Sequence, residues 1–113
     1  MRLLAEKDLF TIVTGDFAAS GVRDDLLNDA ECGPPLRIYL ALTDGRVVAD
    51  LSAEDRWRNR YYWFLRLAKV HRGKFGYDAG IEDQLSRVLE EITQFDITPH
   101  ELEQLELTAH SAQ

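Results

Sequence analysis

The most reactive side chain in this sequence is the thiol of Cys32, the chain's single cysteine. A thiol acts as a nucleophile only when a base or a positive charge lowers its pKa, and no base lies near Cys32 in the sequence. Neighbouring acids such as Asp24 and Asp25 suit general acid–base chemistry, but adjacent residues on a helix point apart. We therefore expect no catalytic residues, although an enzyme could be assembled from groups that converge only in the fold.

The three histidines are candidate metal ligands. They lie far apart in the sequence, without an HExxH motif or a second cysteine, so we expect no metal site. The chain also lacks the glycine-rich loops that hold nucleotide phosphates, and we expect no cofactor. The histidines are His71, His100 and His110.

Residues 55–77 combine aromatic and basic side chains to an unusual degree. They include both tryptophans, three of the four tyrosines and two of the five phenylalanines. Cations that hold phosphates, next to aromatic rings that stack on bases, are typical of single-stranded nucleic-acid binding. This gives one functional hypothesis. Its cations are Arg58, Arg60, Arg66, Lys69, Arg72 and Lys74.

The helical periodicity of the same segment favours a structural role. At about 100° per residue, the apolar side chains of residues 53–72 cover well over half of the circumference, which predicts a largely buried helix at the centre of the core. Only a narrow polar strip and the following loop remain as a basic and aromatic partner-binding site. Its residues are Arg58, Tyr62, Arg66, Lys69, Lys74, Phe75 and Tyr77.

Charge is distributed unevenly along the sequence. The net charge is −7, made up of −4 over residues 1–35, +4 over residues 36–80 and −7 over residues 81–113. Such asymmetry favours charged partners or self-complementary packing. Within the last third, Arg87 is expected to pair with Asp83, Glu90 or Glu91 one helical turn away. The acidic partner-binding candidates are Glu82, Asp83, Glu90, Glu91, Glu101, Glu103 and Glu106.

These observations lead to a non-catalytic protein-binding module as the main functional hypothesis. Carboxylates on helix faces can imitate rows of phosphates, so the sharper form is a small acidic inhibitor or adaptor of a nucleic-acid-processing complex. The analogy is with the anti-CRISPR and antirestriction proteins of phages and plasmids. Single-stranded nucleic-acid binding through residues 55–77 is the alternative, and a homodimer that pairs basic with acidic surfaces is a further one.

Length and hydropathy limit the organisation of the chain. At 113 residues we expect one domain, 1–113, with a frayed C-terminus at 111–113. No apolar run reaches the roughly 18 residues that span a bilayer, and the N-terminus has no signal-peptide core. We therefore expect a cytoplasmic protein without membrane contact.

The first half of the sequence predicts mixed secondary structure. Residues 3–14 fit either a helix or a strand, and residues 20–31 fit a helix that Ser20 could cap. Cys32-Gly33-Pro34-Pro35 should separate elements. Residues 36–42 and 46–51 each alternate apolar side chains around Asp44-Gly45, which predicts a β-hairpin over about 36–51.

The second half predicts three helices. Ser52 should cap the first, which should end at Gly73, with a loop over residues 74–80. Residues 81–95 carry an apolar stripe at helical spacing. Thr98-Pro99, with Glu101, forms a capping box for the last helix. The predicted fold is therefore a helix-dominated α+β domain, with one hairpin packed against four or five helices.

Overall fold

The computed structural model describes residues 24–43 and 51–111, and the regular secondary structure of these residues is entirely helical. The predicted α+β class is wrong, because residues 36–43 of the expected hairpin lie in a helix and no strand occurs in the described part of the chain. The elements are α1 (Asp24–Leu27), α2 (Gly33–Thr43), α3 (Ala53–Phe75), α4 (Ala79–Ile92), the 3₁₀-helix η3 (Thr93–Phe95) and α5 (Pro99–Ser111).

Helix α2 forms where alternation predicted a strand, because its apolar residues are buried on more than one side. Ile38, Tyr39, Ala41 and Leu42 are all buried, whereas an alternating strand would expose every second one. Pro34 and Pro35 were expected to separate two elements. They lie instead in the first turn of α2, where a missing N–H costs no helical hydrogen bond.

The turn before α2 is held by side-chain hydrogen bonds. The Asp29 carboxylate accepts from the backbone N–H groups of Glu31 (3.0 Å) and Cys32 (2.8 Å). Arg37 donates to the carbonyl of Leu27, at the C-terminal end of α1. A Cβ atom on Gly33 would lie 2.5 Å from that same carbonyl oxygen, so the close approach of α1 and α2 requires glycine here.

The predicted helix over residues 20–31 is only partly present. Its described part is helical from Asp24 to Leu27 and then turns. Residues 20–23, the N-terminal element at 3–14 and residues 46–50 of the second predicted strand lie outside the described residues.

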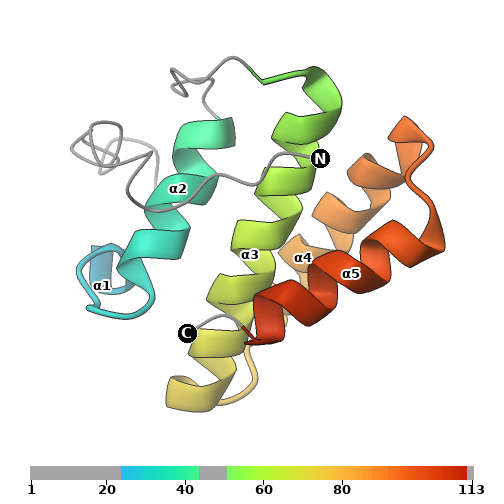
Figure 1. The fold of residues 1–113 in the computed structure, drawn as a ribbon. Coiled ribbons are helices and arrows are strands. Elements are labelled where there is room, and N and C mark those ends of the chain that lie inside the picture. Colours follow the sequence, from blue (N-terminus) through green and yellow to red (C-terminus); the bar gives the residue numbers. More distant parts are fainter. Residues whose placement is uncertain (1–23, 44–50, 112–113) are drawn as a thin grey trace.

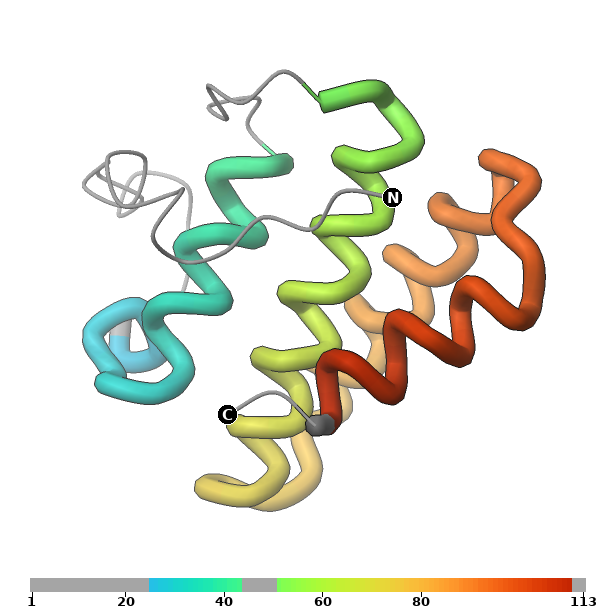
Figure 2. The backbone as a smooth tube through the Cα atoms, viewed as in Figure 1, coloured from blue at the N-terminus to red at the C-terminus, as the bar shows by residue number. Residues whose placement is uncertain are grey.

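Helix α3 is the central helix, as predicted from its wide apolar surface. It packs against α2, α4 and α5 (Figures 1 and 2). The Ser52 hydroxyl accepts from the Asp55 N–H at 3.1 Å, which confirms the predicted cap. The predicted end at Gly73 is wrong: the helix continues to Phe75 and ends at Gly76, whose φ of 85° is in the region that favours glycine.

The two C-terminal helices follow the predicted pattern. Asp78 caps α4 by accepting from the Ile81 N–H, so the predicted 74–80 loop shrinks to residues 76–78. The Thr98 hydroxyl accepts from the Glu101 N–H and Pro99 begins α5, as the capping motif predicts. The Glu101 carboxylate does not complete the capping box, because it binds Arg58 instead.

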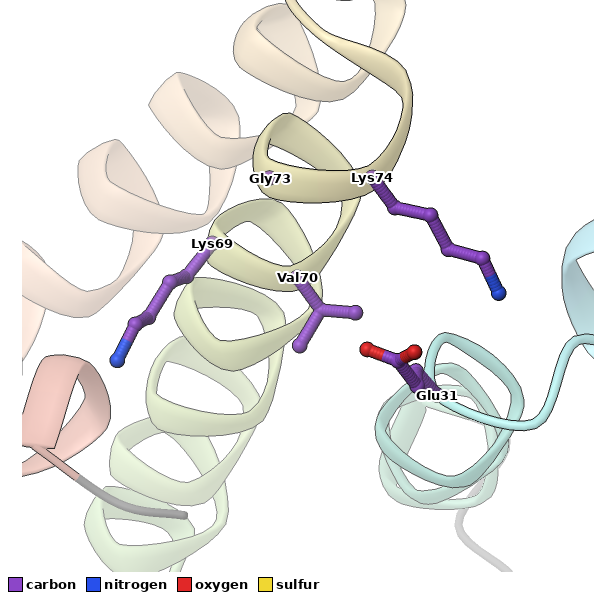
Figure 3. Close-up of a pocket in the computed structure, with 5 residues that line it drawn as sticks. All are labelled: Glu31, Lys69, Val70, Gly73 and Lys74. Carbon is purple, nitrogen blue, oxygen red and sulfur yellow. The ribbon is translucent and has the colours of Figure 1, made fainter.

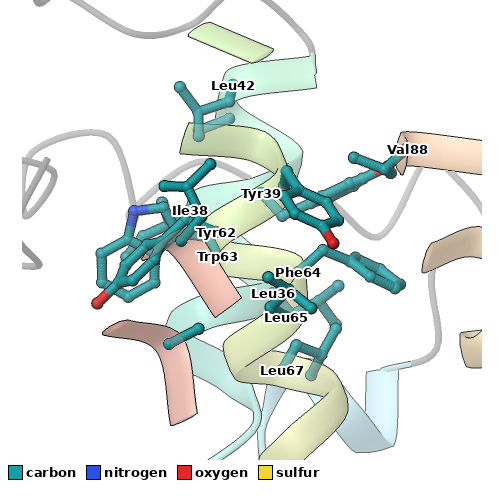
Figure 4. Packing of buried hydrophobic residues seen from close by; sticks show 14 of the residues in the cluster. Leu36, Ile38, Tyr39, Leu42, Tyr62, Trp63, Phe64, Leu65, Leu67 and Val88 are labelled. Carbon is teal, nitrogen blue, oxygen red and sulfur yellow. The ribbon is translucent and has the colours of Figure 1, made fainter. Parts of the chain in front are cut away.

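One hydrophobic cluster joins all five α-helices of the described residues. Figure 4 shows its centre, where side chains of α2 and α3 interdigitate and Val88 of α4 closes one side. In Figure 1, α2 lies on one side of α3, and α4 and α5 lie on the other. No helix within the described residues is both long enough and apolar enough to cross a membrane.

Candidate functional site

Half of the acidic side chains of the last third of the chain face the basic helix α3. Arg58 binds Glu101 of α5 at 3.1 Å, and Arg72 binds Glu82 of α4 at 2.5 Å. The Tyr61 hydroxyl donates to Glu106 of α5 at 2.9 Å, and Arg60 contacts Glu91 of α4 at 3.4 Å. These four contacts attach α4 and α5 to α3, so much of the charge asymmetry serves packing within the molecule.

The remaining cations of the predicted basic site also have intramolecular contacts. Lys74 forms an ion pair with Asp29, Lys69 donates to the backbone carbonyl of His110, and the Arg66 guanidinium lies 4.9 Å from the centroid of the Trp63 ring. Together with Arg58, Arg60 and Arg72, these are all six cations of the nucleic-acid hypothesis. Four of the six are paired with carboxylates, which lowers the positive charge available to a phosphate backbone.

Arg60 is the most deeply placed of these cations. Its side chain is 9% exposed and lies where α2, α3 and α4 meet. It donates to the Thr43 hydroxyl at 3.1 Å and to the Tyr39 hydroxyl at 3.3 Å. Gln84 of α4 donates to the same Tyr39 oxygen at 2.8 Å. This buried polar cluster was missed in the sequence because the hydrogen bonds that link its helices join residues 17 to 45 positions apart.

Three of the predicted acidic residues point away from the core. Asp83 and Glu90 on α4 and Glu103 on α5 are exposed and make no ion pair with any described residue. Arg87 lies between Asp83 and Glu90 on α4, four and three residues away, so all three share one face of the helix. The predicted pairing of Arg87 with these acids does not occur among the described residues, and Glu91 pairs with Arg60 instead.

The aromatic residues of the predicted basic and aromatic site differ in their exposure to solvent. Tyr62 is buried against Trp63 in an edge-to-face contact, so it does not lie on the exposed polar strip where the helical wheel placed it. Tyr62 was misplaced because α3 is covered by helices on more sides than the wheel assumed. Phe75 and Tyr77, in contrast, are 55% and 77% exposed at the turn between α3 and α4. Large exposed aromatics of this kind are frequent anchors in protein interfaces.

Hydrogen bonds within these clusters shift several pKa values. The ammonium of Lys74 lowers the pKa of Asp29, and the guanidinium of Arg72 lowers the pKa of Glu82. Burial raises the pKa of the Cys32 thiol to about 11, which keeps it protonated and weakly nucleophilic at neutral pH. Within the described residues, no three side chains of histidine, cysteine, aspartate or glutamate converge as a metal ion would require.

A groove of about 380 Å³ lies between the last turns of α3 and the turn that joins α1 to α2. It is lined by Glu31, Lys69, Val70, Gly73 and Lys74 (Figure 3). Sequence reasoning did not identify it, because Glu31 is about 40 residues from the other lining residues. Lys69 and Lys74 were the only members predicted to bind a partner.

Comparison with known proteins gives no relative of this chain. No protein-family model matches it, and neither the curated proteins nor the solved structures contain a significant match. Any functional argument therefore rests on the contacts, burial and charges described above.

Proposed function

We propose that this protein is a non-catalytic protein-binding module that presents an acidic face to a basic surface of another protein. Its outward carboxylates, called here the acidic face, are Asp83 and Glu90 of α4 and Glu103 of α5, all of them exposed. The observation that carries the proposal is that these carboxylates point outward without partners in the described residues, whereas their neighbours Glu82, Glu91, Glu101 and Glu106 bind α3.

The packing of α4 and α5 makes the acidic face a pre-formed one. Ion pairs and buried apolar side chains fix both helices on α3, so the outward carboxylates need little ordering when a partner arrives. A fixed negative surface accelerates association with a positive one and makes binding sensitive to salt. Basic channels that hold nucleic acid are one such surface, which is the basis for an inhibitor or adaptor of a nucleic-acid-processing complex.

The exposed turn between α3 and α4 supplies apolar contact area at the N-terminal end of α4. Phe75 and Tyr77 lie immediately before α4, the helix that carries Asp83 and Glu90. Charge complementarity steers a partner, whereas aromatic side chains contribute most of the affinity at interface centres. The nucleic-acid alternative has less support, because the cations that it needs are held by contacts inside the molecule.

The test is affinity capture from a lysate of the organism that encodes the protein, followed by measurement of the captured protein's affinity. Asp83→Asn/Glu90→Gln/Glu103→Gln should weaken binding about tenfold, mainly through slower association. Arg87→Glu adds negative charge on the same face of α4 and should strengthen binding. Leu107→Ser is a control for exposed surface elsewhere, since Leu107 is 55% exposed, like Phe75.

The proposal fails if the neutralised triple variant binds the captured protein as tightly as the wild type. It also fails if Arg87→Glu and the triple variant change affinity in the same direction. The opposite signs matter because a merely structural effect of mutating α4 would weaken binding in both variants.

A further inference from the structure

We propose that α5 exchanges between two copies of this chain, so that the α5 of each copy docks on the α3 of the other in a domain-swapped dimer. The dimer would pair the basic α3 of one copy with the acidic α5 of its partner. Swapping is independent of the proposed function, because it needs no partner other than a second copy of the chain.

Helix α5 is docked chiefly by α3. Among the described helices, α3 is the only one with which α5 shares an extensive contact, and Figures 1 and 2 show α5 turning back from the end of η3 toward α3. Arg58 of α3 binds Glu101 of α5, and the Tyr61 hydroxyl of α3 donates to Glu106 of α5. Leu105 buries its side chain in the core at the same contact. These interactions join two helices that one connection separates, so an α5 from a second copy would reproduce them.

The connection to α5 is short and contains a left-handed residue. Residues 96–98 join η3 to α5 and are called here the hinge. Asp96 has φ 52° and ψ 33°, and no other non-glycine residue in the described part of the chain has a positive φ. Aspartate tolerates this region better than most residues do, but the conformation still costs energy relative to an extended backbone.

The hinge can release this cost by opening. Because Thr98 precedes Pro99, its backbone is disfavoured in a helix, so an opened hinge would extend and not continue η3 into α5. In an extended hinge Asp96 leaves the left-handed region. Short hinges under strain favour the exchange of the element that follows them, because the swapped dimer relieves the strain and keeps the native contacts.

Protein concentration decides between the monomer and the swapped dimer. Both contain the same contacts between α3 and α5, so the difference lies in the cost of association and in the relief of two Asp96 residues. A helix tethered by a short connection has an effective concentration in the millimolar range at its docking site, so swapping should become measurable at about 1 mM protein. The net charge of −7 on each copy opposes association, so salt should favour the dimer.

The first experiment opens the hinge and lets it close again at two concentrations. Wild-type protein at about 0.01 mM and at about 1 mM is held in urea near its unfolding midpoint and then returned to buffer with moderate salt. A thiol reductant excludes a disulfide through Cys32. Size-exclusion chromatography with light scattering should show monomer from the dilute sample and a long-lived dimer from the concentrated one.

A matched pair of aspartate variants tests the hinge. Asp96→Gly should lower the yield of dimer about fivefold, because glycine adopts the left-handed conformation of the closed monomer at little cost. Asp83→Asn changes an exposed aspartate on α4, outside the hinge, and should leave the yield unchanged.

The second experiment identifies which α5 docks on which α3. Arg58→Glu places like charges at the contact with Glu101, and Glu101→Arg does so in a separate variant. Each variant alone keeps this repulsion in its monomer and in its own swapped dimer. In a mixture, a swapped heterodimer restores one opposite-charge pair at one α3–α5 contact and another at the second. Native mass spectrometry of the mixture should show the heterodimer about fivefold above its statistical share.

Three results would overturn the proposal. The wild type could stay monomeric after the urea cycle at the higher concentration, or Asp96→Gly and Asp83→Asn could change the dimer yield equally. The mixed charge variants could also give no more heterodimer than random pairing, which would indicate a dimer whose α5 helices remain on their own chains. The aspartate comparison decides the matter even if a charge variant fails to fold.

Discussion

The guanidinium of Arg60 lies over the indole ring of Trp57, 3.9 Å from the ring centroid. Both residues belong to the basic and aromatic segment that resembled a nucleic-acid platform, yet their mutual contact is at a junction of three helices. The Trp57 ring is in turn 6.0 Å from Phe95 at the end of η3. The cations and rings of α3 therefore bind one another and the neighbouring helices.

Removing the Arg60 side chain should destabilise the fold. Arg60→Ala would leave the Tyr39 and Thr43 hydroxyls without this donor and would remove the cation from Trp57. We expect a loss of about 2 to 3 kcal/mol in the free energy of unfolding, measured by urea denaturation. Arg87→Ala, at an exposed arginine, should change it by less than about 0.5 kcal/mol. Equal effects of the two substitutions would contradict the buried role of Arg60.

Helix α5 provides a matched pair of leucines. Leu105 is fully buried against the core, whereas Leu107 is 55% exposed on the same helix. Leu105→Ala should lower the free energy of unfolding by about 2 to 5 kcal/mol, because it leaves a cavity. Leu107→Ala should change it by about 0.5 kcal/mol or less. Thermal or chemical unfolding of the two variants checks the assignment, and similar losses would mean that α5 is docked through a different face.

Two glycines should respond to alanine in opposite directions. Gly73 lies inside α3 with open space around its Cα, so Gly73→Ala should stabilise the protein by about 0.5 to 1 kcal/mol. At Gly33 a Cβ atom would lie 2.5 Å from the Leu27 carbonyl oxygen, so Gly33→Ala should destabilise it by about 1 to 3 kcal/mol. If Gly73→Ala were destabilising in a denaturant titration, the continuation of α3 to Phe75 would be in error.

Acid should weaken the fold through Asp29 and Glu82. Ion-paired hydrogen bonds with Lys74 and Arg72 lower the pKa of Asp29 below its ordinary value of 3.8 and that of Glu82 below its ordinary value of 4.5. The folded state therefore binds these protons less readily than the unfolded state, so the stabilisation is present above pH 4 to 5 and is lost as the pH falls below it. Unfolding free energies across this range should fall less steeply for Asp29→Asn/Glu82→Gln than for the wild type. If the free energies of unfolding of the two proteins fell in parallel with pH, the ion pairs of Asp29 and Glu82 would not contribute to stability.

The starts of α3 and α5 were predictable because their determinants are local. Ser52 and Thr98 each accept the backbone N–H three residues later, and Pro99 occupies the first turn of α5. Such caps depend only on neighbouring residues, so the sequence contains the whole interaction. The end of α3 was missed by three residues, since Gly73 is tolerated in a helix and Gly76 has the positive φ.

The hairpin was predicted wrongly because residues 36–42 are apolar almost throughout. Apolar residues repeat every 2 residues in a half-buried strand and every 3.6 residues in an amphipathic helix. A segment that is apolar almost throughout fits both repeats, so alternation cannot distinguish a strand from a helix there. Packing decides: Ile38, Tyr39 and Leu42 all face the core formed with α3. The prolines before them were consistent with a helix start as much as with a break.

The division of the acidic residues into inward and outward sets could not be predicted. Arg58 meets Glu101 across 43 residues, and Tyr61 meets Glu106 across 45. Pairs this distant depend on how α5 crosses α3, which no local pattern encodes. The sequence therefore showed that complementary charges were present, but only the fold shows that Asp83, Glu90 and Glu103 remain outward.

The central claim is that most of the positive charge of α3 is engaged in contacts within the molecule, and on this basis we propose that the outer surface binds protein and not nucleic acid. The most direct measurement is binding of a fluorescently labelled single-stranded oligonucleotide at low salt, where phosphate contacts are strongest. We predict no measurable binding by the wild type. Salt-dependent binding that Arg58→Gln, Lys69→Gln or Lys74→Gln weakens would contradict this account and favour a nucleic-acid-binding protein.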